Sequence, residues 1–204
     1  NTEVGRLMAE SMLENIPDGG DIFLIQGPLT DNNVSLIREG IDETLAGSNL
    51  NVVYEANCPG WIAENAYTYT KEGLKLDRNV KGIICGNDDL ASQAFRALSE
   101  ERLAGKVCVT GQDGDLAACQ RIVEETQEMT AFKSVEQEAS LAAKCAVLLG
   151  LGEEIEEVQD TAYDGTYNVP YLELQPIAVT KENMDEVIIK GGFHAKEDVY
   201  LNVN

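Results

Sequence analysis

The chain has 204 residues, of which 44% are hydrophobic and 25% are charged, a balance typical of a globular protein that can bury a core. Its 36 acidic residues outnumber the 15 basic ones and give a formal net charge of -21, which repels nucleic acids and anionic membrane surfaces. The acidic residues are spread over many segments, so they indicate a highly soluble surface and say little about a ligand.

Short apolar segments alternate with amphipathic ones along the first part of the chain. Apolar residues at helical spacing begin at Val4 and stop before Pro17, which predicts a first helix. Strands are then predicted at 21–26, 51–57, 80–85, 106–110 and 128–133, and helices at 34–47, 63–76, 90–103, 116–127 and 134–152. Because parallel strands need a helical crossover between them, this alternation predicts a doubly wound α/β lobe with helices on both faces of a parallel sheet.

The alternation loosens after residue 153, where the chain becomes acidic and rich in turns. Two β-like pieces are predicted at 158–164 and 169–179, followed by a helix-like piece at 181–191. No run of about 18 apolar residues is present, so we expect no membrane insertion of this chain.

The five cysteines form no Cys-x-x-Cys pair, which favours free thiols over a zinc site or a complete disulfide framework. Cys85 and Cys108 lie inside apolar strand-like runs. We therefore expect them to pack as small hydrophobic residues.

Polar side chains follow each predicted strand, at the carboxyl end where ligands of open parallel sheets bind. In chain order these residues are Thr30, Asp31, Asn32 and Asn33, then Trp61, then Asn87 and Asp88, then Asp113 and Asp115, and finally Lys133. Amides, carboxylates and an ammonium supply both donors and acceptors for a ligand with many hydroxyl groups. The indole of Trp61 could lie against the C–H face of a pyranose.

Each of these residues also has an explanation without a ligand. Asn33 and Asn87 stand where helix N-caps or Asx-turns are common, and Trp61 could belong to the core. Asp113 could be a turn carboxylate, and Lys133 a solvated charge at the end of a strand.

Two other kinds of site have little support in the sequence. A metal site would need Asp88, Asp89, Asp113 and Asp115 to gather around Ca²⁺ or Mg²⁺, and no EF-hand spacing is present. The lone His194 has no nucleophile motif beside it and is expected at the surface.

Enzymatic activity has no recognisable basis in the sequence. It contains no GxSxG, GxGxxG, GxxxxGK[ST] or HExxH motif. We therefore predict a protein that is not an enzyme, with no catalytic residues and no cofactor.

Several segments together carry a resemblance to a known family. They are GPLTDNN, CPGWIAENA, CGNDD, LAGKVCVTGQDGDLAACQRI, QEMTAFK and NVPYLELQPIAVTKENMDEVIIKGGFH. In this order, from Asn1 to about His194, the chain resembles the xylose-binding proteins of bacterial ABC importers, a branch of the type I periplasmic binding proteins. The GQD loop and the late segment that ends in Gly-Phe-His are the specific parts; the single tetrapeptides would be weak alone.

The resemblance implies two α/β lobes that close over one monosaccharide. The positions that match the family's sugar contacts are Asn33, Trp61, Asn87, Asp113 and Lys133, which favours a ligand role for them. It also implies an extracytoplasmic protein, periplasmic or lipid-anchored, that captures xylose or a related aldose and delivers it to an ABC transporter permease. The alternative partner is a membrane histidine kinase or chemoreceptor that reads sugar-dependent closure.

One departure from the family concerns the first lobe, because nothing in the chain matches the N-terminal segment that forms most of it. By the same correspondence, residues 1–131 and 175–204 form the second lobe, and residues 132–174 are a remnant of the first. We therefore expect a fragment with reduced affinity. The helix that contains Val135, Ala139, Ala142, Ala146 and Leu149 is expected to be exposed, reordered or covered by another chain.

Overall fold

A computed structural model describes residues 1–156, 158 and 160–203. The chain divides into two compact units. The larger unit comprises Asn1–Phe132 and the chain from Ile177 onward, and the smaller unit comprises Lys133–Pro176.

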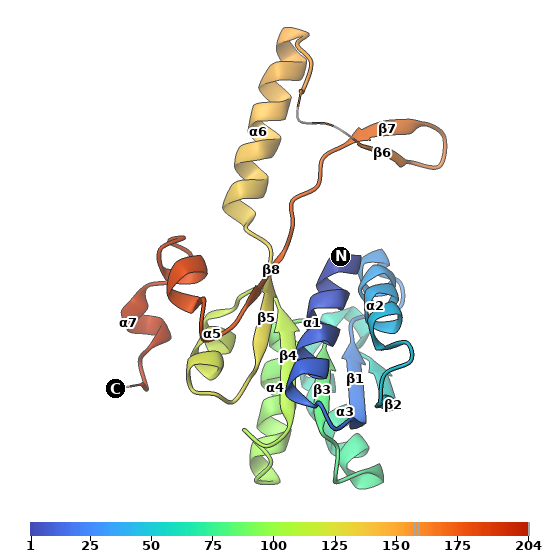
Figure 1. Cartoon of the computed structure of the whole chain (residues 1–204), viewed down its shortest axis with the longest axis vertical. Coiled ribbons are helices and arrows are strands. Elements are labelled where there is room, and N and C mark those ends of the chain that lie inside the picture. The colour runs from blue at the N-terminus through green and yellow to red at the C-terminus, as the bar shows by residue number, and fades with distance from the viewer. Residues whose placement is uncertain (157, 159, 204) are drawn as a thin grey trace. The chain divides into compact units, whose positions relative to one another are not determined.

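The larger unit is built on a six-stranded sheet with strand order β2-β1-β3-β4-β5-β8 (Figure 1). The first five strands run parallel, and β8 pairs antiparallel with β5. The strands are β1 (Gly20–Gln26), β2 (Leu50–Asn57), β3 (Gly82–Cys85), β4 (Cys108–Gln112), β5 (Met129–Phe132) and β8 (Ile177–Val179). The predicted α/β fold with a mostly parallel sheet is therefore confirmed.

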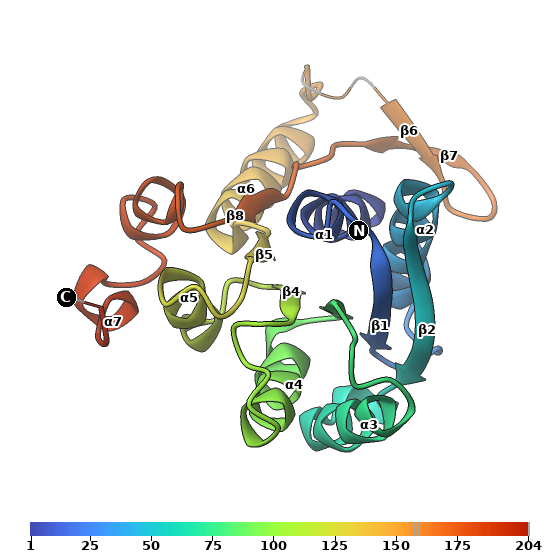
Figure 2. The ribbon, with the colours of Figure 1, turned by 60° about the horizontal axis from the view of Figure 1, so that its bottom comes forward.

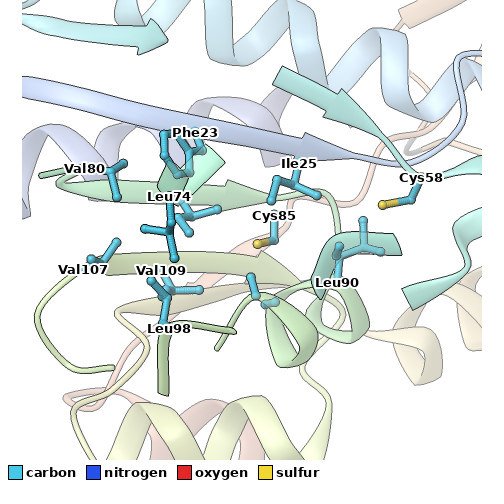
Figure 3. Close-up of a cluster of buried hydrophobic side chains, with 14 residues drawn as sticks. Phe23, Ile25, Cys58, Leu74, Val80, Cys85, Leu90, Leu98, Val107 and Val109 are labelled. Atoms are coloured by element: carbon cyan, nitrogen blue, oxygen red, sulfur yellow. The ribbon is translucent and has the colours of Figure 1, made fainter. Parts of the chain in front are cut away.

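Helices cover both faces of this sheet, as Figure 2 shows for α1 and α2 on one face and α3 and α4 on the other. Their bounds are α1 (Thr2–Asn15), α2 (Asn32–Leu45), α3 (Ala63–Leu76) and α4 (Asp88–Glu100). Successive side chains of β1 point to opposite faces. Ile22 and Leu24 join the α1 and α2 core, whereas Phe23 and Ile25 join the α3 and α4 core (Figure 3).

A third cluster lies beside β8. It combines α5 (Leu116–Val123) with a short π-helix (Asp185–Ile189) and α7 (Lys196–Val199). Phe132 and Val179 are buried in this cluster, so the returning chain completes the core at this end of the sheet.

The smaller unit contains α6 (Val135–Leu151) and a hairpin of β6 (Asp160–Tyr163) and β7 (Asn168–Tyr171). Helix α6 is capped by Ser134, and Gly152 ends it in a left-handed conformation. None of the α6 side chains is buried, which agrees with the expectation of an exposed helix. Within the described ranges, no helix is long and apolar enough to cross a membrane.

Most predicted elements are present, and α3 has the predicted bounds. Most other bounds differ by one to three residues, and the main differences are these. Strand β4 continues through Gly111 and Gln112, and α5 stops at Val123 because Thr126 and Gln127 turn back to donate to the carbonyl of Arg121. The second β-like piece splits into β7 and β8, and only Asp185–Ile189 of the predicted helix at 181–191 is helical.

All five cysteines carry free thiols, and Cys58, Cys85, Cys108 and Cys119 are buried. Desolvation raises the pKa of Cys58 to about 11 and that of Cys119 to about 12. Burial also raises the pKa of Cys85 and Cys108. These groups therefore stay protonated at neutral pH and pack as hydrophobic residues, as predicted for Cys85 and Cys108.

Helices α1 and α2 approach closely through two glycines. A Cβ added at Gly40 would lie 2.0 Å from the carbonyl oxygen of Thr2, and one at Gly5 would lie 2.0 Å from that of Ile37. Backbone atoms cannot move aside as a flexible side chain can, so the contact requires glycine on both helices.

We expect Gly40→Ala to lower the free energy of unfolding by about 2 kcal/mol or more, because the helices must separate. Gly150→Ala in α6 is the control, since nothing lies within 4 Å of its Cβ position. Urea denaturation followed by circular dichroism measures both variants. Equal stability of Gly40→Ala and the parent chain would contradict the close helix contact.

Candidate functional site

The strand order reverses between β1 and β3, because β2 lies beyond β1 whereas β4 and β5 lie beyond β3. Ligands of open α/β sheets bind outside the carboxyl ends of the strands at such a switch point. Two glycines stand there: Gly27 directly follows β1, and Gly86 directly follows β3.

The indole of Trp61 lies against these two glycines. Trp61 ends the short turn Pro59–Trp61 after β2. A Cβ added at Gly27 would lie 2.3 Å from indole Cζ2, and one at Gly86 would lie 3.1 Å from Cζ3. Trp61 also packs partly against the α3 and α4 core, so it is both a core neighbour and a residue of the switch point.

Asn33 is not the cap of α2, because Asp31 has that role. Asp31 is the N-cap of α2, and its Oδ1 accepts a hydrogen bond of 2.9 Å from the backbone N–H of Asn33. The exposed Asn33 side chain accepts a bond of 2.7 Å from Nδ2 of Asn1.

Asn87 is the N-cap of α4. Its Oδ1 accepts a 2.9 Å hydrogen bond from the backbone N–H of Leu90. The capping explanation is therefore correct for Asn87. The cap bond uses the amide oxygen of Asn87 alone. The amide nitrogen, Nδ2, is the donor that this side chain could offer to a ligand hydroxyl.

Asp113 follows β4 with a φ of 102°, a value that residues with a side chain rarely adopt. Its backbone N–H donates to the carbonyl of Ala131 over 3.0 Å. The N–H groups of the next two residues, Gly114 and Asp115, both donate to Oδ2 of Asp88, over 3.0 and 3.1 Å. These bonds hold the loop that presents Asp113 to solvent.

Asp88 is fully buried and connects the first turn of α4 to the loop after β4 and to β5. Its Oδ2 also accepts a 2.7 Å bond from Thr130 of β5. Its Oδ1 accepts a 3.0 Å bond from Gln127, whose amide oxygen in turn accepts 2.9 Å from Nε of the buried Arg121. A Cβ at Gly111 would lie 2.2 Å from Oδ1, so the carboxylate needs a glycine beside it in β4.

Desolvation raises the pKa of Asp88 to about 7, although its bonds from Thr130 and Gln127 and from the Asp115 backbone favour the ionised form. Nearby Asp115 adds a like charge that also raises it.

His194 is not the surface residue that we expected. It is half-buried, and its Nε2 lies 2.7 Å from the carbonyl oxygen of Gly114. A carbonyl oxygen only accepts, so Nε2 carries the proton of this bond. Phe193 packs between His194 and Phe132, with ring centroids 4.5 and 4.8 Å apart. The only sequence signal for this contact was the Gly-Phe-His ending of the family resemblance.

Four of the five predicted site residues therefore belong to one connected arrangement in the larger unit. Asp31 links Asn33 to Trp61. Trp61 lies on Gly86, which precedes Asn87, and Asp88 links that segment to the loop of Asp113. Lys133 is the first residue of the smaller unit and directly follows β5.

The four aspartates considered for a metal do not form such a site. In the part of the chain that the structure covers, no group of three or more His, Cys, Asp or Glu side chains could hold a metal ion. Asp88 is instead occupied by protein donors.

The sequence matches the family described as the periplasmic binding protein domain over residues 1–154. The chain belongs to the periplasmic binding protein family. The match covers β1 to β5 with their helices and all five predicted site residues.

Curated relatives of this periplasmic binding protein chain include two D-xylose-binding periplasmic proteins. The protein of Haemophilus influenzae is 40% identical over 205 residues, and that of Escherichia coli K12 is 36% identical over 204 residues. Each alignment covers 98% of this chain and 61% of the relative. The chain thus spans about three fifths of the length of these relatives.

Solved structures of ABC transporter solute-binding proteins share the fold. One from Clostridium phytofermentans with bound β-D-glucose superposes with a TM-score of 0.83 at 23% identity, over 97% of this chain and 67% of that one. One from Actinobacillus succinogenes with bound D-allose superposes with a TM-score of 0.76 at 24% identity, over 89% of this chain and 60% of that one.

The raised pKa of Asp88 predicts a pH dependence of stability. An unfolded aspartate ionises near pH 4, whereas folded Asp88 stays protonated up to about pH 7. Between these values the folded state binds more protons, so the Asp88 contribution to the unfolding free energy falls as pH rises, by up to about 4 kcal/mol. Asp88→Asn should remove this fall of the unfolding free energy with pH, whether the variant itself is more or less stable than the parent chain.

Urea denaturation of the parent chain and Asp88→Asn at pH 4, 5.5, 7 and 8 tests this. Asp18→Asn, at an exposed turn, controls for the loss of one acidic residue. Equal changes with pH in the parent and Asp88→Asn would contradict titration of the buried carboxyl in this range.

Proposed function

We propose that the chain carries the larger part of a binding site for xylose or a related monosaccharide. It would act in an extracytoplasmic binding protein that delivers the sugar to an ABC transporter permease. Two relatives with 36% and 40% identity are named D-xylose-binding periplasmic proteins. Binding in this proposal is reversible and breaks no bond, so the protein is not an enzyme.

One observation carries the proposal: the Trp61 indole lies across Gly27 and Gly86 at the ends of β1 and β3, where the strand order reverses. An indole provides a large electron-rich surface for the C–H face of a pyranose. Hydroxyl groups of the same sugar both donate and accept, which suits the nearby Asn87 amide and Asp113 carboxylate.

Charged and neutral side chains would bind different hydroxyl groups of the sugar. The Asp113 carboxylate accepts from two hydroxyls, Asn33 and Asn87 donate through their amide nitrogens, and Lys133 donates from an ammonium. Charge-assisted bonds of this kind are shorter and stronger than neutral ones. The resemblance to sugar contacts of the family supports the same five residues.

We further propose that residues 1–131 and 175–204 form one sugar-binding lobe and that residues 132–174 belong to the other. The division of the chain into a larger and a smaller compact unit supports this boundary. Sugar would favour a closed arrangement of lobes because only there do both contact it.

The proposal is tested by titrating the 204-residue chain and the product of its whole gene with xylose, ribose, arabinose, glucose and galactose. Trp61 is the only Trp of the chain, so its fluorescence reports on the site directly. A saturable change with xylose or one related aldose is expected. Silence of both proteins toward all five sugars would overturn the sugar-binding function.

Asp113→Ala and Trp61→Ala should each weaken sugar binding by about 1–3 kcal/mol, through loss of a charged hydrogen bond or of stacking area. Isothermal titration calorimetry measures the affinities, because Trp61→Ala removes the fluorophore. Asp18→Ala is the control for the acidic charge. Unchanged affinity in both site variants would refute the assignment of these two residues.

A further inference from the structure

The backbone of Trp61 is held in an unusual conformation. Its φ is 58°, and the preceding Gly60 has a φ of 61°. A bulky residue rarely adopts a left-handed conformation, and such strain persists only where the surroundings determine the position strongly. The contacts of the indole therefore identify what holds it.

Two kinds of contact hold the indole. Gly27 and Gly86 provide flat backbone beneath it, since a Cβ at Gly27 would occupy the space of the ring and one at Gly86 would press against its edge. The remaining polar contact is the 3.0 Å hydrogen bond from indole Nε1 to Oδ2 of Asp31. The glycines allow several placements of a flat ring, whereas a hydrogen bond to a carboxylate fixes its rotation.

The same carboxylate also orients Asn33. Oδ1 of Asp31 accepts from the Asn33 backbone N–H, and this bond starts α2. One side chain thus bonds to two residues from different loops, after β1 and after β2. Each oxygen of Asp31 has an N–H donor of its own.

We propose that Asp31 is a positioning residue of the binding site, which holds the Trp61 indole across Gly27 and Gly86 and in a defined relation to Asn33. Its role as a determinant of sugar affinity rests on the proposed function. Asp31 acts through Trp61 and Asn33: it orders the aromatic surface before the ligand arrives, so less conformational freedom is lost on binding.

The chemistry of Asp31 allows its two bonds to be separated. Serine is an equally good N-cap, so Asp31→Ser keeps the bond to the Asn33 N–H and the start of α2. The serine hydroxyl offers one oxygen and has no second oxygen for the indole. Asp31→Ser therefore removes the Trp61 bond and preserves the helix cap.

Asp77→Ser is a matched control. Oδ1 of Asp77 accepts from the backbone N–H of Asn79 over 2.8 Å, the same two-residue spacing as Asp31 and Asn33. Asp77 lies at the C-terminal end of α3, away from the strand ends that carry Trp61. Gly27→Ala is the reference for a displaced indole, because its added methyl group occupies the position of the ring.

The experiment has two parts. Acrylamide quenching and fluorescence anisotropy of Trp61 are measured without sugar in the 204-residue chain. Calorimetry then gives the xylose Kd in the same variants and in the product of the whole gene. For Asp31→Ser we expect an increase in quenching constant of about twofold, lower anisotropy, and a Kd about fivefold to tenfold higher. Asp77→Ser should match the parent protein.

Each other outcome is decisive. Unchanged quenching and anisotropy in Asp31→Ser, with a clear change in Gly27→Ala, would overturn the proposal. A released indole with unchanged xylose Kd would also overturn it as a determinant of binding. A released indole in a protein that responds to no sugar would support the Asp31 contact and overturn the proposed function instead.

Discussion

The buried carboxylate of Asp88 connects the first turn of α4, the loop after β4 and the strand β5. Four protein donors surround it, and Arg121 is linked to it through the amide of Gln127. An unpaired charge at this depth would be strongly destabilising. The loop after β4, which includes Asp113 with its φ of 102°, therefore has little conformational freedom.

Asp31 and Asp88 have related roles on the two sides of the switch point. Neither is among the predicted sugar contacts. Asp31 holds the side chain of Trp61 and starts α2, and Asp88 holds the loop of Asp113. Four described residues other than glycine have a positive φ: Trp61, Arg102, Asp113 and Glu125. Two of them, Trp61 and Asp113, are among the residues that we propose contact the ligand, and backbone strain is common at such sites.

The net charge of -21 is compatible with the proposed site but does not determine where the site lies. Most acidic side chains form exposed ion pairs or face solvent, such as Glu186 with Lys190, and contribute little to stability. Asp31 and Asp88, which organise the proposed site, differ from these surface residues because their oxygens accept hydrogen bonds from fixed backbone or ring N–H groups.

The sequence by itself determined the α/β alternation, because burial on both faces of a sheet requires apolar strands and amphipathic helices that can be read locally. It also indicated which loops carry polar residues, and those of the larger unit lie at the strand ends. It did not reveal the end of α5, the split of β7 from β8, or the contact of His194 with Gly114. The end of α5 depends on the local turn that brings Thr126 and Gln127 back to Arg121. Only the tertiary structure decided the split of β7 from β8, the His194 contact and the roles of Asp31 and Asp88, because each depends on partners 26 to 80 residues away that no local pattern encodes.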